Sequence, residues 1–83
     1  MEIMHDILKI VQERGGEIKK THLMYKANLS HNQMKLYLAD LMKNDLLENK
    51  TSGKKQTIGI TKNGRNFSIK YAQVKEFEKT FGL

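Results

Sequence analysis

With 83 residues, 39% of them hydrophobic and 29% charged, the chain has the size of one small domain with a modest core. It contains no cysteine, which excludes disulfides and thiolate metal sites, and its start, MEIMHDILKI, lacks the basic and long apolar runs of a signal peptide or membrane span. We therefore expect a soluble cytoplasmic protein, and the net charge of +6 suggests a polyanionic partner.

The first half of the chain predicts three helices. Apolar residues at helical spacing predict a helix over residues 2–13, which a pair of glycines ends. A short extended segment follows, with Ile18 facing the core, and then a second helix over residues 20–27. A third helix is predicted from Ser30 to about Asn44, and its inner face consists of Met34, Tyr37, Leu38 and Leu41.

The connection between the second and third helices, KANLSHNQMKLYL, indicates a sharp corner. Ser30 is a good N-cap, and Gln33 three residues later completes an S-x-x-Q capping box. Leu29 and Met34 are spaced for a hydrophobic staple across the helix start. Asn28 tolerates the left-handed backbone that such a corner often needs. This pattern predicts a helix-turn-helix.

The second half of the chain predicts a β-hairpin and one long helix. LLENK and QTIGI are predicted to be short strands joined by the turn TSGKK. Thr61 can cap a last helix from Lys62 to about Thr80. The order of elements is that of an α+β winged helix-turn-helix with a long C-terminal helix. We assign residues 1–61 to the winged-helix domain and residues 62–83 to a dimerisation helix within the same compact unit.

Several stretches together resemble the small archaeal winged-helix family of ArnR-like regulators and dimeric chromatin proteins. They are the Y-x-A-x-L-S corner, the Y-L-x-x-L of the third helix with N-D-L-L after it, and I-T-x-x-G-R-x-F at the start of the last helix. They cover most of the chain from Lys19 onward. The resemblance implies binding of double-stranded DNA by a dimer joined through the final helix.

The charge distribution supports a surface for DNA. Residues 19–56 contain eight basic and three acidic side chains, whereas residues 1–18 contain two basic and four acidic ones. The N-terminal part of a third helix of this type usually enters the major groove. There an asparagine can pair with adenine and a lysine with guanine, while Leu36 and Ala39 can touch a thymine methyl.

The candidate DNA-binding residues lie on three elements. The hairpin lysines can reach phosphates or the minor groove, and the start of the second helix can hold a phosphate. The full set is Lys19, Lys20, Thr21, Ser30, His31, Asn32, Lys35, Leu36, Ala39, Lys43, Lys50, Lys54 and Lys55. A solvated lysine-rich face remains the alternative on composition alone.

The last helix carries aromatic and aliphatic residues at intervals of four, three, three and four: Phe67, Tyr71, Val74, Phe77 and Phe81. A helix of this length projects beyond a three-helix core, and exposed phenylalanines on a monomer form a sticky patch. We therefore expect a homodimer through these residues. A strict seam would bury Glu78, so an antiparallel or splayed pair is expected. The alternative is that the helix folds back over the first helix of its own chain.

No catalytic, cofactor or metal site is visible in the sequence. The three histidines lack ligand spacing, and Gly15-Gly16 lacks the lysine and spacing of a phosphate-binding loop. We expect no enzyme activity, no cofactor and no small-molecule ligand. The favoured function is a dimeric winged-helix protein that binds double-stranded DNA as a transcription regulator. The alternatives are an architectural chromatin protein with little sequence preference, and a protein-interaction module whose basic face meets an acidic partner.

Overall fold

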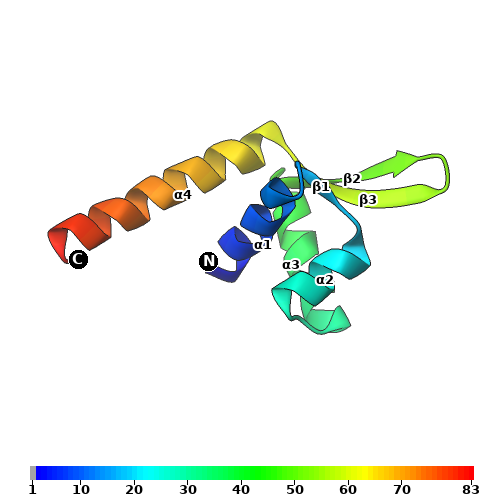
Figure 1. Ribbon diagram of the computed structural model, residues 1–83, viewed down its shortest axis with the longest axis horizontal. Helices are drawn as coiled ribbons and strands as arrows, with labels where there is room; N and C mark the ends of the chain where they lie inside the picture. The colour runs from blue at the N-terminus through cyan, green and yellow to red at the C-terminus, as the bar shows by residue number, and fades with distance from the viewer. Residues whose placement is uncertain (1) are drawn as a thin grey trace.

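The computed structural model describes residues 2–83, and its order of elements confirms the predicted α+β winged-helix fold (Figure 1). In chain order the elements are α1 (Glu2–Glu13), β1 (Glu17–Ile18), α2 (Lys20–Ala27), α3 (His31–Lys43), β2 (Leu47–Ser52), β3 (Lys55–Ile60) and α4 (Lys62–Phe81). The bounds of α1 and α2 agree with those predicted from apolar spacing. In the part of the chain described, no helix is both long and apolar enough to span a membrane.

All four of these helices end with a left-handed residue and a hydrogen bond that reaches back into the last turn. After α2, Asn28 has φ 55, and the next amide donates to the carbonyl of Met24 at 3.2 Å. After α3, Asp45 has φ 57, and the next amide donates to the carbonyl of Leu41 at 2.9 Å. Glycines take this position after α1 and α4. The prediction for Asn28 is confirmed, whereas Asp45 was not anticipated.

The hydrophobic core is built from α1, α2, α3 and the sheet. Its buried members are Ile7, Leu8, Val11, Ile18, Leu23, Met34, Leu38, Leu41, Leu47, Ile58 and Ile60. From α4, Phe67 is only partly buried and packs against the edge of this cluster. The long helix therefore lies outside the core, and its position depends on contacts at its first half.

The sheet has the strand order β1-β3-β2, with both pairings antiparallel. Ile18 pairs with Ile58 and is buried, which confirms the prediction that Ile18 faces the core. The hairpin differs from the prediction, because Ser52 pairs with Lys55 and the turn has two residues rather than five. Gly53 occupies the first turn position with φ 63, where a two-residue turn of type II′ favours glycine.

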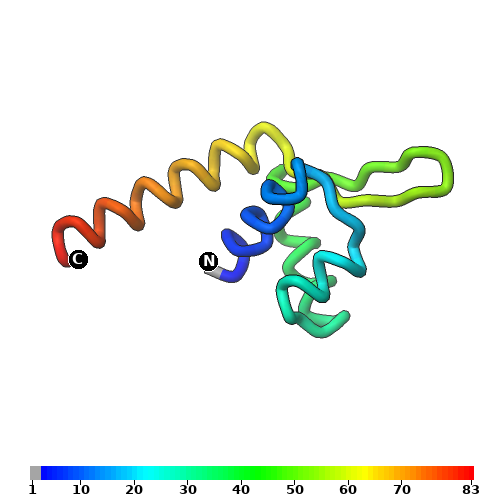
Figure 2. The backbone as a smooth tube through the Cα atoms, viewed as in Figure 1, coloured from blue at the N-terminus to red at the C-terminus, as the bar shows by residue number. Residues whose placement is uncertain are grey.

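Two projections extend in opposite directions from the core, the hairpin on one side and α4 on the other (Figures 1 and 2). They account for the elongated shape, with principal extents of 48 × 26 × 22 Å. The first half of α4 packs on α1, where the ring of Tyr71 stacks on that of His5 at 4.4 Å between centroids. Ser68 is buried beside it, and its Oγ lies 3.4 Å from Oε1 of Gln12.

This packing divides the five residues predicted for dimerisation. Phe67 and Tyr71 contact their own chain, because they share the face of α4 that covers α1 and the core edge. The side chains of Val74, Phe77 and Phe81 are 55%, 56% and 65% exposed. The first half of α4 therefore folds back over α1, as the alternative expected, whereas its second half extends away from the rest of the chain.

Candidate nucleic-acid interface

The corner between α2 and α3 has the predicted capping box. Oγ of Ser30 accepts from the amide of Gln33 at 3.2 Å, and Oε1 of Gln33 accepts from the amide of Ser30 at 3.0 Å. Leu29, just before the cap, is half-buried against the core that contains Met34. These contacts determine where α3 begins and at what angle it leaves the corner.

The structure divides α3 into a buried and an exposed face, as its 3.6-residue spacing predicts. Met34, Leu38 and Leu41 are buried. The exposed residues include those predicted to contact bases or phosphates: His31, Asn32, Lys35, Leu36, Ala39 and Lys43. Leu36 is 69% exposed, which is unusual for a leucine in the middle of a helix that covers a core. A contact with another molecule would remove this apolar surface from water.

A shallow groove beside the exposed face of α3 is lined by residues from four elements, α2, α3, β2 and β3. Lys20 from the first turn of α2, Lys35 and Ala39 from α3, and Asn49 from β2 line it, and its floor consists of Leu38, Met42 and Ile58. The groove thus combines two lysine side chains and one asparagine amide with an apolar floor. This arrangement suits a negatively charged backbone with flat, partly apolar bases.

Asn49 is a member of this groove that the sequence did not identify. Its Nδ2 lies 3.6 Å from the Sδ of Met42, which directs the amide toward the C-terminal half of α3. The signal was present in the alternation of β2, because residue 49 lies two positions after the buried Leu47 and therefore on the same face of the sheet.

The hairpin lysines do not join this groove. Lys50 pairs with Thr57, so it lies on the sheet face opposite Asn49 and Ile58. Its side chain crosses Gly59, where a Cβ would lie 2.7 Å from Cε of Lys50. Lys55 alternates onto the same face, and Lys54 lies in the turn at the tip. Because a strand places neighbouring residues on opposite faces, Lys50 and Lys55 lie on the sheet face away from this groove, and their contact with phosphates stays a prediction.

At the start of α2, Lys19, Lys20 and Thr21 are exposed. Lys19 precedes the helix with an extended backbone and makes no side-chain capping bond. The first backbone amides of α2 therefore receive no capping hydrogen bond from the side chain of Lys19, and Lys19 and Lys20 place two basic side chains near them. Of the three, Lys20 lines the groove with Lys35.

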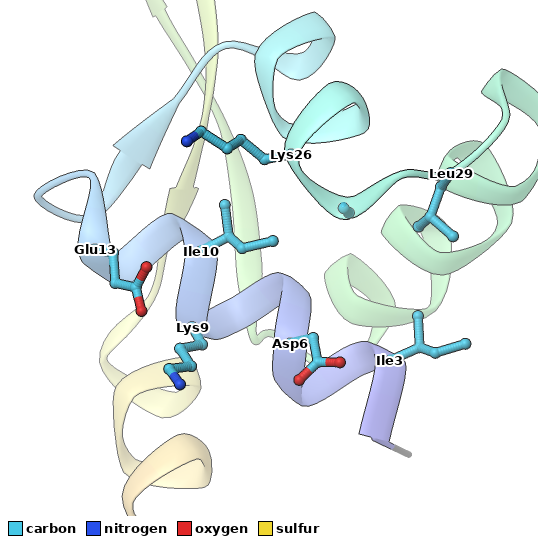
Figure 3. A pocket seen from close by; sticks show the side chains of 8 residues that line it. Ile3, Asp6, Lys9, Ile10, Glu13, Lys26 and Leu29 are labelled. Carbon is cyan, nitrogen blue, oxygen red and sulfur yellow. The ribbon is translucent and has the colours of Figure 1, made fainter.

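A second groove lies between α1 and the end of α2 (Figure 3). Its lining consists of Ile3, Asp6, Lys9, Ile10, Glu13, Lys26, Ala27 and Leu29. Acidic and basic side chains balance there, and no residue predicted for DNA takes part. This groove is consequently unlike the lysine-lined one beside α3 and does not fit a polyanion.

The exposed apolar surface of α4 forms a separate patch, which we call the arm patch: Val74, Phe77 and Phe81. The rings of Phe77 and Phe81 are tilted against each other at 4.7 Å between centroids. Across residues 2–83 the structure contains no group of three His, Cys, Asp or Glu side chains that could hold a metal ion.

Comparisons with known proteins agree with this architecture. The family model described as winged helix-turn-helix matches residues 1–79. Among curated proteins none matches the sequence. Sso10a-2, a DNA-binding protein from Sulfolobus solfataricus, is 25% identical, with a TM-score of 0.70 over 98% of this chain and 85% of that one.

Two further solved structures share the fold at lower identity. F93 from STIV, a winged-helix DNA-binding protein, is 16% identical with a TM-score of 0.76, over 92% of this chain and 87% of that one. The PcaV transcriptional regulator from Streptomyces coelicolor is 12% identical with a TM-score of 0.76, over 94% of this chain but only 57% of that one. With a family model matched over nearly its whole length and this order of elements, the chain belongs to the winged helix-turn-helix family.

Proposed function

We propose that the protein is a homodimeric transcription regulator that binds double-stranded DNA in the cytoplasm and contributes no catalytic activity. In this proposal α3 enters the major groove, and the start of α2 and the tip of the hairpin hold the phosphate backbone. The likeness to the DNA-binding Sso10a-2 over 98% of this chain supports an archaeal origin and a place near the ArnR-like and chromatin proteins.

The observation that carries the proposal is the groove beside α3. Lys20 and Lys35 come from different helices and both line it, so that two basic side chains belong to one groove. In a protein with a net charge of +6, a polyanion bound in this groove would neutralise the charges of both lysines. On the same helix as Lys35, Asn32 in the first turn and Leu36 in the middle are exposed and could reach base edges.

The domain assignment and the dimer belong to the same proposal. Residues 1–61 would contact DNA, and the arm patch of residues 62–83 would meet its copy around a two-fold axis. An exposed cluster of two phenylalanines in contact and a valine on a projecting helix supports this, because water contact with such a patch is unfavourable. A two-fold axis would present two copies of α3 to successive turns of one duplex.

The test is duplex binding by fluorescence anisotropy over a range of salt concentrations, first on a random-sequence duplex and then on sequences enriched from a random library. We expect affinity to fall linearly with the logarithm of the salt concentration. Asn32→Ala and Lys35→Ala should each weaken binding to an enriched site by about 1–3 kcal/mol and affect random duplex far less.

Lys9→Ala and Asn66→Ala serve as matched controls, because both residues are exposed on helices away from the groove. Equal losses on enriched and random DNA would favour the architectural alternative, as would failure of the library to yield any enriched sequence. Binding that does not respond to salt, or no duplex binding at low salt, would contradict the proposal and favour a protein partner.

A further inference from the structure

The joint between the winged-helix body and α4 is held by a group of hydrogen bonds around Asp45. The hydroxyl of Thr61 donates to the carbonyl oxygen of Asp45, and Oγ1 of Thr61 also accepts from the amide of Gly64 at 2.9 Å. Nδ2 of Asn63 donates to Oδ2 of Asp45 at 2.8 Å. The amide of Thr61 donates to the carbonyl of Leu46 at 3.1 Å. The start of α4 is thus bonded to the turn that follows the recognition helix α3.

Asp45 takes a left-handed position at which its carboxylate has a specific partner in α4. Its φ of 57 is left-handed, a conformation that glycine adopts without the steric cost of about 1–2 kcal/mol that a Cβ brings. Glycine takes the corresponding position after α1 and α4, and asparagine takes it after α2. The aspartate places a negative charge at the N-terminus of α4, beside the positive end of the helix dipole and within reach of Asn63.

The first turn of α4 is closely packed against the turn that follows α3. A Cβ at Gly64 would lie 2.1 Å from the carbonyl oxygen of Leu46, so the first turn of α4 touches the backbone of the turn directly. One and two turns further along the same face of the helix, Ser68 and Tyr71 pack on Gln12 and His5 of α1. Two different elements therefore support the first half of α4 and fix its direction relative to α3.

We propose that the Asp45–Asn63 hydrogen bond sets the direction of α4 and, through it, the separation of the two recognition helices in the dimer. This inference rests on the arm-patch dimer proposed above. About 15 helical residues separate the joint from Phe77, a lever of roughly 22 Å. A change of about 10° at the joint therefore moves the body by about 4 Å, more than the rise of about 3.4 Å per base pair. Asp45 and Asn63 act as positioning residues for half-site spacing.

The test measures the distance between the two copies of α3 by pulsed electron spin resonance. Because the described chain contains no cysteine, Asp40→Cys introduces one labelling site per protomer on an exposed position of α3 outside the predicted DNA-contact residues. In this background Asp45→Gly removes the carboxylate while allowing the left-handed turn, and Asn63→Ala removes the same bond from the other side. Asn66→Ala is the matched control on the same helix.

We expect one narrow distance distribution for the parent and for Asn66→Ala, and distributions broadened by about 4 Å for both joint variants. DNA selected from a random library should show a single half-site spacing for the wild type and several for the joint variants, with affinity for one half-site unchanged. An unaltered narrow distribution in both variants would overturn the inference while leaving the proposed function intact. The absence of any inter-label distance, with sedimentation as a monomer, would overturn the dimer and this inference together, while salt-dependent DNA binding could persist.

Discussion

The replacement Gly64→Ala tests the close approach between α4 and the turn after α3. The added Cβ would lie 2.1 Å from the carbonyl oxygen of Leu46 and 2.7 Å from Cγ1 of Ile60. Both are shorter than contacts that real Cβ atoms make, and a backbone carbonyl cannot swing aside as the end of a side chain can. The start of α4 must therefore move away by roughly 1 Å.

The size of the effect follows from opposing contributions. Overpacking at a close contact costs about 1–3 kcal/mol. The shift also weakens the Thr61–Leu46 and Asn63–Asp45 hydrogen bonds, each worth about 0.5–1.5 kcal/mol. Against this, alanine is a better helix former than glycine by about 1 kcal/mol. We expect a net loss of about 1–3 kcal/mol in the free energy of unfolding.

Urea unfolding followed by circular dichroism at one fixed protein concentration measures this loss. With a slope of about 1 kcal/mol per molar urea for a chain of this size, the midpoint should fall by about 1–3 M. Asn66→Ala on the same helix is the control and should leave the midpoint unchanged or raise it slightly, since its side chain is exposed. If Gly64→Ala unfolds at the wild-type urea concentration, the close packing at the joint is not present in solution.

Three further predictions concern the corner, the hairpin tip and the arm patch. Ser30→Ala should cost about 0.5–2 kcal/mol of stability, and a double-mutant cycle with Gln33→Ala should show coupling; additive losses would mean that the box is not formed. Lys54→Ala should reduce the slope of log affinity against log salt by about one, and an unchanged slope would remove the tip from the interface. Phe77→Asp combined with Phe81→Asp should give a sedimenting monomer that keeps its helical content, and a dimer that survives both changes would place the interface elsewhere.

The elements that sequence reasoning predicted well are those whose signals are local. The capping box at Ser30 involves residues three apart, and the two faces of α3 follow from a 3.6-residue period within one helix. The left-handed Asn28 was predictable because asparagine tolerates that backbone better than most residues. Each of these statements could be made without knowing where any other element lies.

Other features required knowledge of the packed structure. Asp45 is left-handed in a sequence with no glycine at that point, and its carboxylate partner Asn63 lies 18 residues away in another element. The hairpin turn was predicted three residues too long, because the pairing of Ser52 with Lys55 depends on the partner strand. The groove beside α3 brings together residues from α2, α3, β2 and β3, which no local pattern in the sequence predicts.

The division of α4 into a packed and a projecting half connects the proposed site to the stability of the chain. The core contains no fully buried apolar side chain from α4. The position of this helix therefore depends on the joint at Asp45 and on the contacts of Ser68 and Tyr71 with α1. Beyond Tyr71, a few turns of isolated helix are marginal in water. In the proposed dimer a second copy would cover the apolar surface of the arm patch. Pairing would then stabilise the outer turns of α4 and hold two copies of α3 at one separation. Helix formation, dimerisation and DNA spacing would then depend on the same 20-residue element.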